Sequence, residues 1–143
     1  MYNISEAAQE LSNYYVWQST PMPMYEEDFV RIVVQSIKQL YNDRNHPEEY
    51  DRTLYTTDDD GNVFYGVEFD IMKEEYIFVL SQIRFMRMIM ADVSGDGAVS
   101  YTTDALSVTG AKEAYKSVKQ EIDDLDRRRI ELFHKMMAHE EEG

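Results

Sequence analysis

The chain has 143 residues, no cysteine and a formal net charge of −14 at pH 7. A chain of this length fits one domain that buries a core without disulfide bonds or metal, and the lack of cysteine excludes a disulfide framework, cysteine-ligated zinc and a thiol nucleophile. The acidic balance argues against sequence-specific or wrapping contacts with nucleic acid, because phosphate contacts need Lys and Arg.

The first third of the chain predicts two amphipathic helices joined by an extended connector. Residues 6–18 form the first expected helix, with Asn3 or Ser5 as its cap and apolar residues along one side. Pro21 and Pro23 follow, and each proline restricts the residue before it, so the helix cannot continue. A second helix is expected over 26–42, where a stripe of buried residues recurs at spacings of three and four. The stripe consists of Phe29, Ile32, Val33, Ser36, Ile37, Leu40 and Tyr41.

The next segment changes from a helical to an alternating pattern and predicts a β-hairpin over about 52–69. Two runs rich in Thr, Tyr, Val and Phe, 52–57 and 62–69, flank the turn sequence Asp-Asp-Asp-Gly at 58–61. A hairpin of two strands is marginally stable alone. We therefore expect it to lean on the helices or on another subunit.

Two further helices complete the expected fold. Residues 70–91 are apolar nearly all round from position 76, so this helix should be buried at the centre. Its apolar run contains Arg84 and Arg87 and is short for a bilayer, so we expect no membrane partner. A heptad stripe predicts a long final helix over about 105–139 that packs along another helix. The sequence thus predicts one mainly α domain over 1–143, a bundle of about four helices with one β-hairpin insertion.

Residues 92–104, DVSGDGAVSYTTD, reproduce the front half of an EF-hand-type calcium loop. The candidate metal ligands are Asp92, Ser94, Asp96, Ser100 and Asp104. Position 12 of the loop should be a bidentate carboxylate, but Thr103 occupies it and Asp104 comes one residue late, so calcium would bind weakly. The simpler alternative is a turn between two helices, with Gly95 and Gly97 supplying positive φ.

No catalytic motif is present, whether a G-x-S-x-G elbow, a Walker loop, G-x-G-x-x-G or H-E-x-x-H. We therefore expect no enzyme, and no cofactor other than weakly bound calcium. Eleven tyrosines and nine methionines instead favour an interaction protein. The candidate interface residues are Pro21, Met22, Met24 and Tyr25 in the connector, Leu54, Tyr55, Phe64 and Tyr65 in the hairpin, and Arg127, Arg128 and Phe133 in the last helix. Internal packing, or a solvated helix face for the arginines, is the alternative at these positions.

Three consecutive segments also resemble a known family. They are the hairpin TLYTTDDDGNVFYGVEF, the apolar helix DIMKEEYIFVLSQIRFMRMI and the final segment YTTDALSVTGAKEAYKSVKQEIDDLDRRRIELFHKM. The order of these segments and their pattern of residue types resemble those of small head-to-tail connector (adaptor) proteins of tailed bacteriophages. The resemblance covers roughly 53–137 and contains no diagnostic string. The DVSGDG stretch and the tyrosine-rich first helix depart from the family pattern.

The resemblance implies a structural neck protein of the virion, assembled in the host cytoplasm. Its copies would form a homo-oligomeric ring between portal and tail components, and DNA would pass through the lumen. The composition agrees, because an acidic ring repels the phosphate backbone. Two other functions stay open: a small calcium-binding helical module that uses 92–104, and an acidic regulatory protein that occupies a basic partner.

Overall fold

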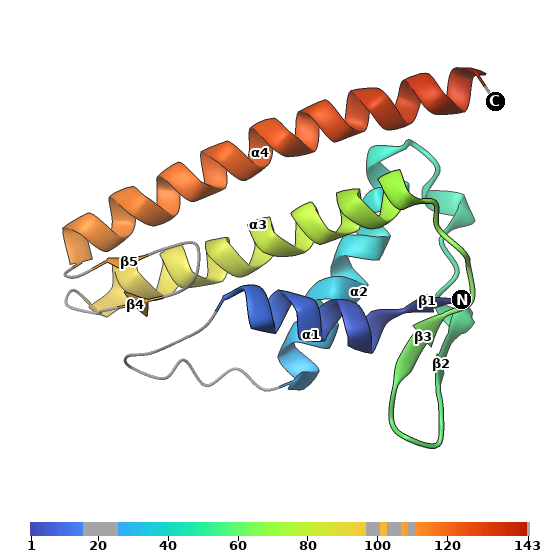
Figure 1. Cartoon of the computed structure of the whole chain (residues 1–143), viewed down its shortest axis with the longest axis horizontal. Helices are drawn as coiled ribbons and strands as arrows, with labels where there is room; N and C mark the ends of the chain where they lie inside the picture. Colours follow the sequence, from blue (N-terminus) through green and yellow to red (C-terminus); the bar gives the residue numbers. More distant parts are fainter. Residues whose placement is uncertain (16–25, 97–100, 103–106, 109–110, 143) are drawn as a thin grey trace.

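The computed structural model describes residues 1–15, 26–96, 101–102, 107–108 and 111–142 of the chain. Its centre is the helix α3 (Ile71–Asp96), with α4 (Ala111–Glu142) lying along one side and α1 (Ile4–Tyr14) and α2 (Glu26–Asp43) packed on the other (Figure 1). The fold is mainly helical with a small antiparallel sheet, which confirms the predicted fold class. The helices are α1 (Ile4–Tyr14), α2 (Glu26–Asp43), α3 (Ile71–Asp96) and α4 (Ala111–Glu142), with short 3-10 helices η1 (Pro47–Glu49) and η2 (Arg52–Leu54).

Helix α1 begins earlier than predicted because its cap lies at Asn3. The Asn3 side chain accepts a hydrogen bond from the Glu6 backbone N–H at 3.0 Å, which satisfies one of the free donors of the first turn. Ile4, Ala8 and Leu11 then place three buried side chains on the face toward α2 and α3. The expected connector after this helix lies outside the described residues.

Helices α2 and α3 meet through a pair of buried serines. Ser36 and Ser81 are both completely buried, and their hydroxyl oxygens lie 3.1 Å apart. Each hydroxyl also donates back to a carbonyl one turn earlier in its own helix, at Ile32 and Ile77. Because both side chains are small and both hydroxyl groups are hydrogen-bonded, the two helix backbones can approach closely around a core of aliphatic residues.

The sheet has three strands where the sequence predicted two. Its order is β1-β3-β2, with β1 (Tyr2–Asn3), β2 (Tyr55–Thr57) and β3 (Val63–Tyr65). The predicted hairpin forms, but 52–54 is a 3-10 helix and the strands are short. Asp58 closes the turn by accepting hydrogen bonds from the backbone N–H groups of Asp60 and Asn62, while Gly61 takes a φ of 85°.

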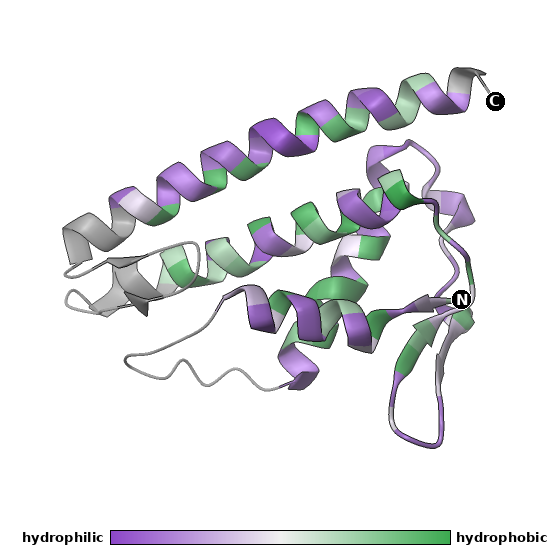
Figure 2. Ribbon diagram, viewed as in Figure 1, coloured by the Kyte–Doolittle hydropathy of each residue, from purple (hydrophilic) through white to green (hydrophobic). Residues whose placement is uncertain are grey.

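The end of α3 and the start of α4 differ from expectation. Helix α3 continues to Asp96, so the expected end near Ala91 is wrong. Helix α4 begins at Ala111, after the paired strands β4 (Tyr101–Thr102) and β5 (Ser107–Val108), instead of near residue 105. Its predicted heptad stripe is buried against α3 at Val118, Leu125, Leu132 and Met136. In Figure 2 most of α4 is hydrophilic, with hydrophobic residues on the side toward α3.

Among the described residues, no helix combines the length and the apolar character that crossing a membrane requires.

Candidate interaction surfaces

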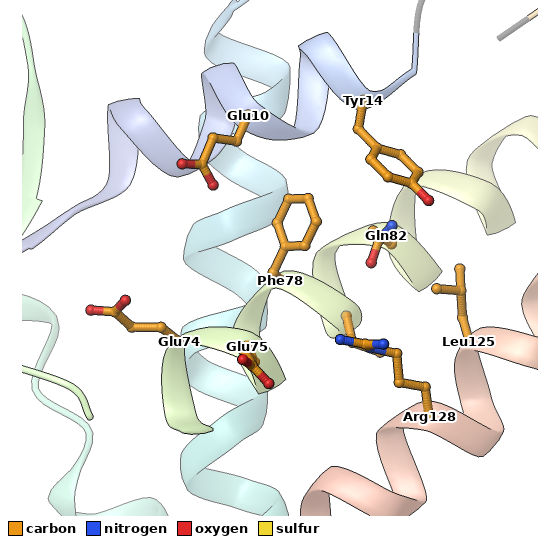
Figure 3. Close-up of a pocket in the computed structure, with 9 residues that line it drawn as sticks. Glu10, Tyr14, Glu74, Glu75, Phe78, Gln82, Leu125 and Arg128 are labelled. Carbon is orange, nitrogen blue, oxygen red and sulfur yellow. The ribbon is translucent and has the colours of Figure 1, made fainter. Parts of the chain in front are cut away.

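The first candidate surface is a cleft of about 440 Å³ between α1, α3 and α4. Figure 3 shows its wall, where the Phe78 ring stands between Glu10 and Tyr14 and the Arg128 side chain reaches in from α4. A second cleft of about 260 Å³ continues toward the N-terminus and shares Glu10, Glu74 and Phe78 with the first. We call the two clefts together the acidic groove; it is lined by Glu6, Glu10, Tyr14, Glu74, Glu75 and Phe78.

Carboxylates dominate the electrostatics of the acidic groove. Tyr2 lines its N-terminal part, and its pKa is raised first by burial and then by the nearby charges of Glu74, Glu10 and Glu6. Arg128, from α4, brings a guanidinium group into the wall of the first cleft (Figure 3). The Tyr14 and Phe78 rings meet edge to face with centroids 6.2 Å apart and provide the apolar part of the wall.

A second surface lies where α3 passes α2 and consists of Arg84, Arg87 and Met88, which we call the basic ridge. The Arg84 guanidinium donates a hydrogen bond to the Gln39 Oε1 atom at 2.8 Å. Burial lowers the pKa of Arg84, and the charge of Arg87 lowers it further. Within the described part of the chain, no carboxylate lies at ion-pair distance from either guanidinium. Met88 beside them is 43% exposed.

The hairpin is fastened to the helices by a cluster of aromatic rings around Tyr65. Tyr65 is completely buried, and its ring stacks on Tyr50 and Phe69 with centroids 6.1 and 6.0 Å away. Its hydroxyl accepts a hydrogen bond from the Asp51 backbone N–H at 3.1 Å. The side chain of Tyr65 is therefore an internal anchor, which is the alternative of internal packing at this position, and it offers no exposed surface to another subunit.

The other predicted hairpin residues are half-buried. Leu54, Tyr55 and Phe64 keep part of their surface accessible. Burial raises the pKa of Tyr55, and so does its hydroxyl contact with Tyr50 at 3.0 Å. These three side chains can thus contribute to a contact at the edge of the sheet, although they also pack internally.

The predicted interface residues of α4 have different roles. Arg127 is exposed and forms an ion pair with Asp124 of its own helix. Phe133 is half-buried against Tyr76 of α3, with ring centroids 6.3 Å apart. Arg128 is exposed and lines the acidic groove. Of these three residues, Arg128 is the one that the structure brings to a candidate surface.

The remaining predicted residues are not brought together by the described structure. The connector residues Pro21, Met22, Met24 and Tyr25 lie outside the described residues. Asp92, Ser94 and Asp96 belong to the helical backbone of α3, whereas an EF-hand-type site needs these positions in the loop that wraps the ion. Ser100 and Asp104 lie outside the described residues, so calcium binding stays a prediction.

Sequence reasoning missed the acidic groove. The available signal was the pair Glu6 and Glu10, which four-residue spacing places on one side of α1. Glu74 and Glu75 open α3 more than sixty residues later in the chain, and nothing local indicates that they face the same groove.

Comparison of the chain with protein-family models, with curated proteins and with solved structures gave no match. The projecting hairpin, the acidic groove and the basic ridge are thus the features from which a function can be inferred.

Proposed function

We propose that the protein is a non-enzymatic structural assembly protein, a protomer of a homo-oligomeric ring in the neck of a tailed-phage virion. Its partners would be further copies of itself and the portal and tail components, assembled in the host cytoplasm. The observation that carries the proposal is the β2–β3 hairpin, which extends from the helical body as a separate projection (Figure 1). A projection of this kind suits contacts between subunits, because it adds contact area without disturbing the helical core.

The hairpin is built to hold its position. Tyr65 anchors its base in the aromatic cluster, and Asp58 fixes its tip through two backbone N–H groups. Ordering such an element before association lowers the entropy that assembly must overcome. A hairpin that is ordered before association in this way supports the proposed subunit contact.

The charge of the hairpin tip fits a channel for DNA. Asp59 and Asp60 are exposed next to Asp58, in a chain whose net charge is −14. Carboxylates that face a lumen repel phosphate, so DNA slides past them instead of binding. The proposal therefore includes no sequence-specific contact with nucleic acid.

The test is light scattering on size-separated protein at two protein concentrations, in EDTA and in millimolar calcium, followed by electron microscopy of the main species. We expect a closed oligomer that does not depend on calcium and does not retain DNA. The matched variant Asp59→Lys/Asp60→Lys should assemble equally well but bind DNA in a salt-dependent way. A monodisperse monomer at both concentrations, alone and with a portal protein, would refute the proposal.

The acidic groove favours a second candidate, an acidic regulatory protein that binds a basic partner. This candidate predicts a monomer that captures a basic polypeptide through Glu10 and Glu74. A monomer that becomes more heat-stable only with calcium would instead favour the calcium-binding module.

A further inference from the structure

The acidic groove and the basic ridge face away from each other across α3. Arg84 follows Glu75 by nine residues, which is about two and a half turns of helix, so the two side chains leave the helix on opposite sides. The groove lies between α1, α3 and α4, whereas Arg84 contacts Gln39 of α2. One chain thus carries two different charged surfaces that cannot meet within the same molecule.

We propose that the basic ridge of one copy docks into the acidic groove of a second copy. This inference rests on the proposed ring and names a contact between its subunits in addition to that of the hairpin. A contact between two different patches is heterologous, so each bound copy leaves a free groove and a free ridge for the next one, and the chain of contacts closes into a ring if the rotation allows it.

The charges on the two surfaces are complementary. The groove presents Glu10, Glu74 and Glu75 as exposed carboxylates without an ion pair to any described residue. The ridge presents the guanidinium groups of Arg84 and Arg87, and the charge of Arg87 is close enough to lower the pKa of Arg84. Asp43 has the opposite but smaller effect on Arg84, and no carboxylate of the described structure lies at ion-pair distance from either guanidinium. Docking would provide each set with the opposite charge.

The apolar parts of the two surfaces also match. Met88 is exposed beside Arg87, and the groove exposes the rings of Tyr14 and Phe78. A flexible thioether packs well against aromatic rings, and a guanidinium stacks favourably on them. Met88 and the arginines of the ridge can therefore pack against the aromatic wall of the groove, in addition to the attraction between opposite charges.

The test is a charge-reversal exchange between two full-length variants. The groove variant is Glu10→Lys/Glu74→Lys, and the ridge variant is Arg87→Glu; all three positions are exposed, so the fold should tolerate them. Asp59→Lys/Asp60→Lys is the control for the groove variant because it changes the net charge equally. Lys116→Glu, an exposed position on the side of α4 opposite its buried residues, is the corresponding control for the ridge variant. Circular dichroism and thermal unfolding establish that each variant is folded.

We expect each reversed variant alone to associate about a hundredfold more weakly than the wild type, because like charges now meet. Mixing the two variants should restore a complex, since the intact ridge of the groove variant fits the intact groove of the ridge variant. Both control variants should assemble like the wild type. Light scattering measures all of these states.

Two results overturn the inference and are distinguishable from failure of the ring. If the wild type forms a ring and both folded reversed variants form it equally well, the ring stands and this contact is wrong. If the mixture of folded variants does not associate, the contact is also wrong. If the wild type is monomeric under every condition, the ring itself fails and this contact fails with it.

Discussion

Replacing Tyr65 by Ala should remove the anchor of the hairpin. Tyr65 is completely buried, and four aromatic rings have centroids within 6.5 Å of its own, those of Tyr41, Tyr50, Tyr55 and Phe69. Truncating a buried aromatic residue to Ala typically costs about 3–5 kcal/mol. A domain is stable by only about 5–15 kcal/mol, so Tyr65→Ala should lose a large part of the total free energy of unfolding.

The conservative variant Tyr65→Phe separates packing from hydrogen bonding. It keeps the ring but removes the hydroxyl that accepts from the Asp51 N–H, and we expect a loss of about 1 kcal/mol. Urea unfolding followed by far-UV circular dichroism measures both variants, at a protein concentration where the chain is monomeric. If Tyr65→Ala costs no more than Tyr65→Phe, the ring is not packed as described and the hairpin is not anchored there.

Three further perturbations follow from the same structure. Asp58→Ala removes the acceptor of two backbone N–H groups in the hairpin turn and should cost about 1 kcal/mol in thermal unfolding, whereas Asp59→Ala should cost almost nothing. Arg44→Met removes the guanidinium group that lies 2.6 Å from the half-buried carboxylate of Glu140. We expect the free energy of unfolding, measured in urea, to fall by about 1–3 kcal/mol. An unchanged urea midpoint would show that this ion pair does not hold α4. Burial, followed by the charge and the hydroxyl hydrogen bond of Tyr65, raises the pKa of Tyr41 to about 12. The pKa of a tyrosine in the unfolded chain is about 10. Because the folded state holds this proton more tightly, the stabilisation from Tyr41 is complete below about pH 10 and decreases as pH rises toward 12, by at most about 1.4 kcal/mol per pH unit. The raised pKa values of Tyr2 and Tyr55 add to this loss. A urea midpoint that stays constant over that range would contradict the prediction.

The buried faces of the helices could be predicted from the sequence because they depend on local spacing. The predicted stripe of the second helix is the set of residues that the structure buries. These residues are Phe29, Ile32, Val33, Ser36, Ile37, Leu40 and Tyr41. A period of about 3.6 residues reports which side chains share a face, and this signal does not depend on what covers the face. The same reasoning holds for the described part of the stripe in α4, from Val118 to Met136.

Features that depend on contacts distant in the chain could not be predicted. Strand β1 has only two residues, Tyr2 and Asn3, which is too short for an alternating pattern, and it exists because β3 offers an edge for pairing. Tyr65 was assigned to an interface because a strand pattern does not tell which face meets the helices. The ion pair between Arg44 and Glu140 joins residues almost a hundred positions apart.

The acidic groove shows how core packing determines a surface that no local pattern encodes. Tyr15, just after α1, stacks on Phe85 of α3 with centroids 4.6 Å apart and an angle of 26° between the rings. The Tyr15 hydroxyl also accepts a hydrogen bond from the Gln82 amide at 3.3 Å. These contacts hold α1 across α3, so that carboxylates from both helices, at Glu10 and Glu74, line one groove. Repulsion between these carboxylates destabilises the folded state, and the packing of the core must outweigh it. A cationic surface bound in the groove would reduce the repulsion. Assembly through the groove would therefore stabilise the fold as well as join the subunits.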